Sequence, residues 1–186
     1  NVGYIKLDRF AQTSNTEFEE SLAKLKTQKM KSLILDLRGN TGGYLNIAAE
    51  LSNQFLKKDM TIVYTEGDKS PKQIFNTDKN GKFTDGKLII LIDEGSASAS
   101  EIVSGAVQDW DRGILIGRRS FGKGLVQRPF NLPDGSQVRL TTARYYTPTG
   151  RCIQRSYEKG SEDYYNEMTK RMKHGEIYHY DSIQFH

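Results

Sequence analysis

Two short apolar runs constrain the fold more than any other feature of this chain. Residues 33–37 and 88–93 are nearly continuous hydrophobic segments, and each leads into a loop of small residues and then a helical pattern. Continuous apolar strands are typical of a sheet that is covered on both faces. Because such strands alternate with helices here, the sequence predicts an α/β domain.

The remaining predicted elements complete that alternation. Strands are expected at residues 2–7 and 114–117, and a hairpin is expected from 125–130 and 137–146, closed by Pro133-Asp134-Gly135. Three helices are indicated by apolar residues at helical spacing, and Ser, Thr and Asn residues at 13–16 can cap the first of them. The apolar positions are Phe18, Leu22 and Leu25, then Ile47, Leu51 and Phe55, then Ile102, Val103, Ala106, Val107 and Trp110.

The length and the distribution of residue types predict one domain with a different kind of tail. A chain of 186 residues can bury about 70% of the surface that it exposes when unfolded, so it can form a core. Residues 1–155 are expected to form this core domain. Residues 156–186 are rich in Tyr, Glu, Lys and His, and are expected to be a polar tail of the same domain, helical around 162–172.

Composition excludes several classes of protein. The longest apolar run, residues 88–92, is far shorter than the roughly 20 residues of a membrane helix, and the chain opens without a signal-peptide pattern. A single cysteine, Cys152, excludes an intramolecular disulfide. The net charge of +4 comes without a long basic run, which argues against nucleic-acid binding.

Three loops follow predicted strands, at the sheet edge where open α/β sheets bind ligands. Residues 38–43 contain three glycines, which suit either a tight turn or a site where backbone N–H groups bind an anion. In residues 95–100, the serines at 96, 98 and 100 are helix caps or nucleophiles. The third loop covers residues 117–124.

The third loop matches the phosphate-binding pattern GxxxxGK only in part. Gly124 stands where a Ser or Thr should bind magnesium, and the residues that follow favour a strand over a helix. Nucleotide binding is therefore disfavoured. What remains is Lys123 between two glycines, beside apolar Phe121 and Leu125. We expect folding to bury this amine, because a desolvated lysine can act as a general base.

Histidine is a poor candidate for the base. The chain has only His174, His179 and His186, all in the polar tail and without the spacing of a zinc motif. A Ser-Asp-His order that uses Asp109 is formally open, but residues 95–99 lack the GxSxG elbow of that class. Lysine is the simpler base, and neither a metal nor a cofactor is expected.

At this point three motifs carry a resemblance. These motifs resemble those of the carboxyl-terminal processing (tail-specific) peptidases. They are Gly95-Ser-Ala-Ser-Ala-Ser-Glu-Ile-Val-Ser-Gly-Ala-Val-Gln-Asp109, then Ser120-Phe-Gly-Lys-Gly-Leu-Val-Gln127, and upstream Asp36-Leu-Arg-Gly-Asn-Thr-Gly-Gly43. That family consists of serine endopeptidases with a Ser-Lys dyad. The likeness covers roughly residues 2–155, and implies a ClpP/crotonase-like β-α-β core with a hairpin extension.

The resemblance implies roles for individual residues. Ser98 matches the nucleophile, Lys123 the base, and Gln127 the glutamine that orients the lysine. The oxyanion would be held by the backbone N–H of Ala99 and by that of Gly42 or Gly43, between which the sequence does not choose. Glu101 and Asp109 match positions near the dyad that support its geometry.

The resemblance also implies a biological setting. The expected substrates are unfolded proteins or proteins with exposed carboxyl termini, and the expected location is the bacterial cell envelope, periplasmic or anchored through an omitted N-terminal segment. Homo-oligomers are compatible with it. The PDZ domain that usually gates the family's active site has no counterpart in residues 1–186. A different class of function stays open: a module on the same fold that binds a peptide or a small hydrophobic ligand without cleaving it.

Overall fold

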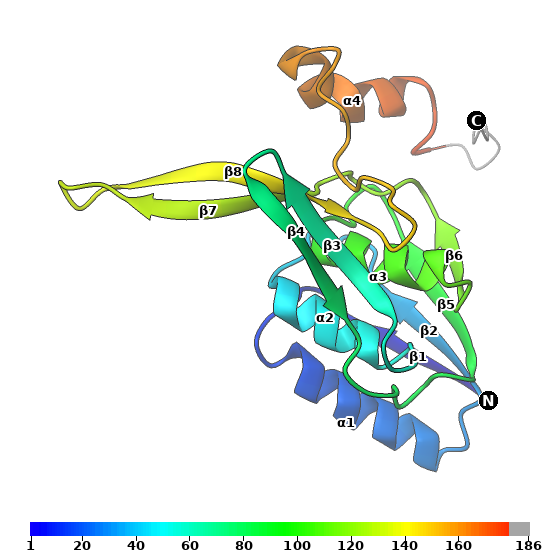
Figure 1. The fold of residues 1–186 in the computed structure, drawn as a ribbon. Coiled ribbons are helices and arrows are strands. Elements are labelled where there is room, and N and C mark those ends of the chain that lie inside the picture. The colour runs from blue at the N-terminus through cyan, green and yellow to red at the C-terminus, as the bar shows by residue number, and fades with distance from the viewer. Residues whose placement is uncertain (179–186) are drawn as a thin grey trace. The chain divides into compact units, whose positions relative to one another are not determined.

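The computed structural model describes residues 1–178, which belong to two compact units. The first unit is Asn1–Gln154, and the second begins at Arg155. The first unit contains two sheets and three helices (Figure 1). The helices are α1 (Ser14–Thr27), α2 (Leu45–Asn53) and α3 (Ala99–Asp109).

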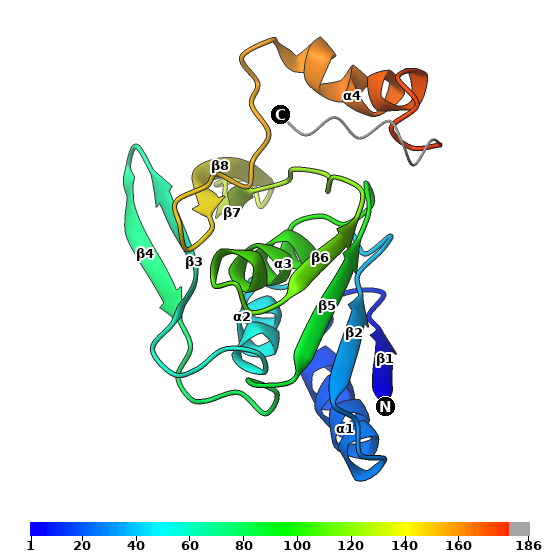
Figure 2. The ribbon, with the colours of Figure 1, turned by 90° about the vertical axis from the view of Figure 1, so that its right-hand side faces the viewer.

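The first sheet is entirely parallel, with the strand order β1-β2-β5-β6. Figure 2 shows these four strands side by side. Buried residues of α1 and α3 belong to one core cluster with the strands, and α2 contacts both helices. Parallel neighbours require crossover connections, which α1 and α3 supply. The strands are β1 (Val2–Lys6), β2 (Ser32–Asp36), β5 (Lys87–Ile92) and β6 (Ile114–Gly117).

The second sheet is antiparallel, with the order β4-β3-β8-β7. The distal part of the β7–β8 hairpin projects away from the rest of the first unit (Figure 1). Its turn follows Asn131, as the Pro-Asp-Gly sequence predicts. The strands are β3 (Thr61–Gly67), β4 (Ser70–Asn76), β7 (Leu125–Asn131) and β8 (Gln137–Tyr146).

The core lies where the parallel sheet meets α1, α2 and α3. Leu33 and Leu35 of β2 are completely buried, as is Leu51 of α2. On α3, every residue from Ala99 to Val107 is buried, because this helix packs against α2 and β3 as well as the parallel sheet. Because the helix is covered on more than one side, its polar residues Ser100, Glu101 and Ser104 are buried along with its apolar ones.

The α/β prediction is confirmed, and so are the four parallel strands, the three helices and the β7–β8 hairpin. Two strands were missed. No strand is predicted for residues 56–87, yet β3 and β4 form a hairpin there. The reason is that β4 is mostly exposed and contains Pro71, so it lacks the apolar signal of a buried strand.

The second unit contains one helix in the described residues, α4 (Ser161–Lys173), which confirms the helix expected around 162–172. Its first turn carries Glu162 and Asp163 and its last turn carries basic residues, as favours a helix dipole. None of the helices within residues 1–178 is both long and apolar enough to span a membrane.

Candidate active site

The carboxyl ends of β2 and β5 lie side by side, because these strands are parallel neighbours. Asp93 ties together the two loops that follow them. Its Oδ1 accepts hydrogen bonds from the backbone N–H groups of Gly39 at 2.8 Å and Gly95 at 2.9 Å. The glycine loop and the serine run, which are far apart in sequence, therefore meet at the edge where ligands bind in this fold class.

The three serines of the run differ in what their hydroxyl groups do. Ser96 and Ser100 are fully buried, and their Oγ atoms donate to the backbone oxygens of Leu37 and Asn40, each at 2.8 Å. Ser98 is half-buried, and its Oγ donates to no acceptor in the part of the chain that the structure describes. Two of the serines are thus structural, and Ser98 alone presents a hydroxyl proton that is still available.

Ser98 also has an unusual backbone. Its φ is 53° and its ψ is −110°, a conformation that costs a non-glycine residue free energy and is concentrated at functional sites. Gly42 packs directly against it. A Cβ atom at Gly42 would lie 2.8 Å from the Cβ of Ser98 and 2.9 Å from the nitrogen of Ala99. Only glycine allows the two loops to approach so closely.

Backbone N–H groups without acceptors lie next to Ser98. Ala99 is the first residue of α3, where N–H groups lack partners within the helix, and its N–H has no acceptor among residues 1–178. The N–H of Gly42 donates to Oδ1 of Asn40 at 2.9 Å. The N–H of Gly43 has no such partner within the described chain. Of the two glycines that the sequence left open, Gly43 is the one whose N–H is available.

Asn40 holds the glycine loop in place, and sequence reasoning missed it. The side chain is completely buried; it donates to the backbone oxygen of Leu7 at 2.7 Å and accepts from Gly42. Its backbone oxygen accepts from the N–H of Ala97 and from the hydroxyl of Ser100. The only signal in the sequence is an amide residue inside a glycine-rich turn, where asparagine is common for local reasons.

Asp36 fixes the start of the same loop. Its carboxylate accepts hydrogen bonds from the Arg38 guanidinium, from the Arg38 backbone N–H and from the hydroxyl of Tyr4. The guanidinium beside it and these hydrogen bonds hold the pKa of Asp36 well below its usual range. The pKa of Arg38 is raised by the same pairing. Asp36 is therefore a structural anion at the end of β2.

Glu101 joins the serine run to the loop of residues 120–123. Its Oε2 accepts from the backbone N–H groups of Ser98 at 2.8 Å and Lys123 at 2.9 Å. Its Oε1 accepts from the Ser120 hydroxyl and from the Gly122 N–H, both at 2.7 Å. The residue is only 6% exposed, and burial raises the pKa of its carboxyl although these four hydrogen bonds act in the opposite direction.

That carboxylate brings the backbones of Ser98 and Lys123 to within two hydrogen-bond lengths of each other. The Lys123 side chain, however, is exposed, and its amine makes no ion pair or hydrogen bond with any described residue. The prediction that folding buries this amine is wrong for this structure. The loop docks through its backbone N–H groups, which leaves the side chain in solvent. Gln127, on β7, is likewise exposed.

Asp109 lies at the other end of α3. Its carboxylate accepts from the backbone N–H and hydroxyl of Thr149 and from the guanidinium of Arg151, so it anchors the turn after β8. At a rise of 1.5 Å per residue, the helix places it about 15 Å from Ala99. The prediction that Asp109 lies near the dyad is therefore wrong.

The two alternative chemistries gain no geometric support. Residues 118–124 lead into β7 without forming a helix, so no helix N-terminus follows the GxxxxGK match. Within residues 1–178, no group of three or more His, Cys, Asp or Glu side chains is arranged to hold a metal. His174 follows α4, whereas His179 and His186 lie outside the described residues.

A family model then decides the relationship. The model of peptidase family S41 matches residues 1–162. The chain belongs to this family. Its similarity to the carboxyl-terminal-processing proteases confirms the resemblance that the three motifs carry.

Individual relatives support the assignment of this chain to family S41. A carboxy-terminal-processing protease of Bartonella bacilliformis is 43% identical over 159 residues, which cover 83% of this chain and 36% of that protein. Carboxyl-terminal-processing peptidase 3 of Arabidopsis thaliana, a chloroplastic protein, is 41% identical over 80% of this chain and 28% of its own length. This chain thus spans about a third of the length of such relatives.

A solved structure shares the fold. The photosystem II D1 C-terminal processing protease superimposes with a TM-score of 0.79 at 33% identity, over 82% of this chain and 39% of that chain. A putative S41 protease from Bacteroides fragilis superimposes with a TM-score of 0.68, and at 19% identity it supports the fold alone. The mixed arrangement of parallel and antiparallel sheets is therefore the S41 arrangement.

Proposed function

We propose that this chain is the catalytic core of a serine endopeptidase that cleaves polypeptides near their carboxyl termini with a Ser-Lys dyad. One observation carries the proposal: of three serines at the sheet edge, Ser98 alone keeps an undonated hydroxyl, and two N–H groups without acceptors lie beside it. A nucleophile next to paired N–H donors is the arrangement that acyl transfer requires.

The mechanism follows from these positions. Lys123, in its neutral form, takes the proton of the Ser98 hydroxyl, and Oγ attacks a peptide carbonyl carbon. The oxyanion that forms accepts hydrogen bonds from the N–H groups of Ala99 and Gly43. The protonated lysine then gives its proton to the leaving amine, and water hydrolyses the acyl-enzyme. Each preorganised oxyanion donor typically contributes about 2.7 to 4 kcal/mol to the stabilisation of the transition state.

The base must move for this step to occur. The Lys123 amine lies in solvent although its backbone is held beside Ser98 by Glu101. We propose that a bound polypeptide covers the loop, excludes water and brings the amine against Oγ, where Gln127 orients it. Desolvation of an amine favours its neutral form, which is the form that a base needs. We thus propose that the substrate binds first and that the Ser98–Lys123 dyad forms afterwards.

Single substitutions test the dyad. Ser98→Ala and Lys123→Ala should each lower the cleavage rate of an unfolded protein by about 10⁴-fold or more. Ser136→Ala and Lys69→Ala, at exposed turn positions, are matched controls that should cleave normally. A peptide that carries a fluorophosphonate group should label the unaltered chain and not Ser98→Ala, because its peptide part covers the loop as a substrate does. Normal cleavage by either dyad variant contradicts the proposal, and peptide binding without cleavage or labelling indicates a binding module.

The proposed substrates are proteins with exposed carboxyl termini, as the names of the relatives suggest. The relatives come from bacteria and from a plant chloroplast. The bacterial cell envelope stays the proposed location of this chain. Fractionation of cells that produce the complete protein, with antibody detection in the envelope and cytoplasmic fractions, tests it.

A further inference from the structure

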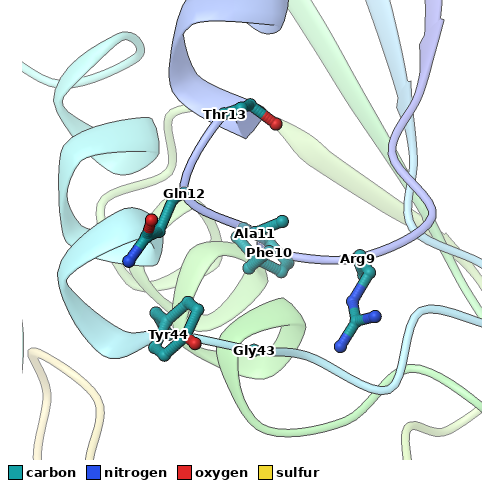
Figure 3. Close-up of a pocket in the computed structure, with 7 residues that line it drawn as sticks. All are labelled: Arg9, Phe10, Ala11, Gln12, Thr13, Gly43 and Tyr44. Carbon is teal, nitrogen blue, oxygen red and sulfur yellow. The ribbon is translucent and has the colours of Figure 1, made fainter.

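A cavity of about 640 Å³ opens beside the glycine loop. Its lining comes from two segments only: the connection between β1 and α1, and the two residues that lead into α2. In Figure 3 the side chains of Arg9 and Tyr44 lie on either side of Gly43. The lining residues are Arg9, Phe10, Ala11, Gln12, Thr13, Gly43 and Tyr44.

The charge of this lining has one sign. Arg9 is its cation, and the lining contains no Asp or Glu. The Arg9 guanidinium makes no ion pair with any described residue, because the neighbouring Asp8 is paired with Lys6 at 3.0 Å. The Arg9 backbone is nevertheless fixed, since its oxygen accepts a hydrogen bond from the Ser14 hydroxyl. The cavity thus presents an uncompensated positive charge on an exposed side chain whose backbone is fixed.

Other groups add to the positive electrostatic potential of the cavity. Tyr44 is the N-cap of α2, which has neither a side-chain cap nor an acidic residue in its first turn, so the positive end of that helix is uncompensated. Thr13 is the N-cap of α1 and also makes no side-chain cap; the acidic residue of that helix, Glu17, lies outside the lining. The hydroxyl groups of Thr13 and Tyr44 can both donate to an anion.

The position of the cavity relates it to the reaction. Gly43 lines the cavity and also supplies the N–H that we assign to the oxyanion, while the adjacent Gly42 packs against Ser98. A polypeptide with its scissile carbonyl at Ser98 therefore places a neighbouring residue at this cavity. Guanidinium groups bind carboxylates through two parallel hydrogen bonds, which gives direction as well as charge complementarity.

We infer that this cavity is a substrate subsite for a carboxylate that lies close to the scissile bond. The inference rests on the proposed peptidase function and adds a preference to it. The carboxylate has two sources, an Asp or Glu side chain or the terminal carboxylate of a substrate cleaved near its end.

Cleavage of matched peptides tests the subsite and separates these sources. One set of quenched fluorescent peptides carries Glu, Gln or Lys in turn at each position within three residues of the cleaved bond. A second set ends at varied distances from that bond, with a free or an amidated carboxyl terminus. We expect kcat/KM to be at least tenfold higher for one Glu peptide than for its Gln partner, or for one free terminus than for its amide.

Variants of Arg9 assign the preference. In Arg9→Ala, the ratio of kcat/KM between the preferred acidic peptide and its neutral partner should fall to less than about twofold. In Arg9→Glu, the Lys peptides should be cleaved faster than the Glu peptides. Arg139→Glu, an equal change of charge at an exposed position of β8, should leave the preference intact. Equal cleavage of charged and neutral peptides by the unaltered chain overturns the inference. A preference that survives Arg9→Ala also overturns it.

Binding separates the failure of this inference from failure of the proposed function. The same peptides are titrated into the Ser98→Ala chain and followed by fluorescence anisotropy. If acidic peptides bind in an Arg9-dependent way and the unaltered chain cleaves none, the peptidase function is wrong while the carboxylate site stands. If peptides are cleaved by Ser98 without any effect of Arg9 on cleavage or binding, the site is wrong and the function stands.

Discussion

The two halves of the candidate site are built in different ways. The serine half, residues 37–43 and 93–101, is held by buried hydrogen bonds that Asn40, Ser96 and Ser100 donate, and by the backbone N–H of Gly39, which donates to Asp93. The lysine half, residues 120–127, is attached mainly through backbone groups and presents Lys123 and Gln127 to solvent. The nucleophile and the oxyanion donors are therefore preorganised, whereas the base has yet to be assembled.

This difference indicates where the site can be controlled. Preorganised donors cost no reorganisation when charge develops, so the serine half benefits from rigidity. A general base on a loop can be brought into place by the bound polypeptide. An exposed lysine that becomes competent only when it is covered would keep the peptidase inactive until a substrate is seated.

Outside the dyad itself, Glu101 is the residue whose loss should have the largest effect, because it joins the two halves. In Glu101→Gln one carboxylate oxygen becomes an NH₂ group, which faces two N–H or O–H donors and can accept from neither. We expect kcat to fall about 100-fold, since small displacements of reacting groups have effects of that size. Steady-state kinetics measures it, and circular dichroism at 25 °C establishes that the variant is folded.

A kcat within threefold of the unaltered value for Glu101→Gln would show that the two halves do not depend on this carboxylate. The two halves would then be held together mainly by the other contact between them, the hydrogen bond from the Phe121 N–H to the Ser96 backbone oxygen.

A matched pair of glycines tests the close packing of the serine half. Both Gly39 and Gly42 have positive φ, but a Cβ at Gly39 meets nothing within 4 Å, whereas one at Gly42 meets Ala97, Ser98 and Ala99 below 3 Å. Gly39→Ala should therefore lower the free energy of unfolding by about 1 kcal/mol, the cost of the backbone conformation alone. Gly42→Ala should lower it by a further 1–3 kcal/mol, roughly, and should also reduce cleavage.

Chemical denaturation of the two glycine variants, followed by far-ultraviolet circular dichroism, measures these differences. Equal destabilisation of both would mean that the glycine loop has room to move away from Ser98. The serine half would then be less rigid than its hydrogen bonds indicate.

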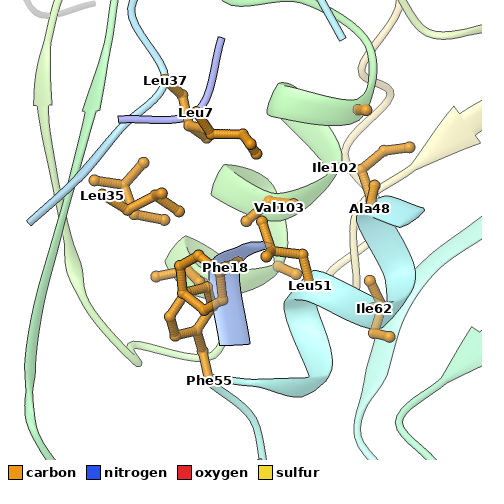
Figure 4. Close-up of a cluster of buried hydrophobic side chains, with 14 of the residues drawn as sticks. Leu7, Phe18, Leu35, Leu37, Ala48, Leu51, Phe55, Ile62, Ile102 and Val103 are labelled. Carbon is orange, nitrogen blue, oxygen red and sulfur yellow. The ribbon is translucent and has the colours of Figure 1, made fainter. Parts of the chain in front are cut away.

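The smallest effect is expected on the hairpin. Leu140 of β8 is 50% exposed, whereas Leu51 of α2 is completely buried in the core (Figure 4). Leu51→Ala should lower the free energy of unfolding by about 2–5 kcal/mol, and Leu140→Ala by less than about 1 kcal/mol. Thermal and chemical denaturation of both variants test this. A loss at Leu140 as large as that at Leu51 would mean that another surface covers the hairpin in solution.

Much of the fold was predictable because its signals are local. Residues 33–37 and 88–93 are apolar runs of strand length, and the Pro-Asp-Gly turn marks the β7–β8 hairpin in a few residues. The β3–β4 hairpin was not predicted. β3 carries β-branched residues at 61–63 and pairs with β8, about 80 residues away in the chain. β4 is an exposed edge strand that contains Pro71, so it lacks the apolar signal of a buried strand.

The site was predictable only in part. The resemblance of the motifs to the family pattern singled out Ser98, Lys123 and Glu101, and the fold brings the backbones of these residues together. Asp109 was misplaced because its nearness in sequence to Ser98 is stretched along the axis of α3. Asn40 was missed because its importance lies in a buried hydrogen bond to Leu7, which is 33 residues away.

The sequence by itself determined the class of the domain, the family and the identity of the chemical groups. These follow from residue type and from spacing along the chain, which do not depend on packing. Tertiary structure alone decided which of three serines keeps its hydroxyl available, which of two glycines keeps its N–H, and that the lysine amine faces solvent. The reason is physical: the availability of a donor or of a charge depends on the atoms that surround it, and those atoms come from distant parts of the chain.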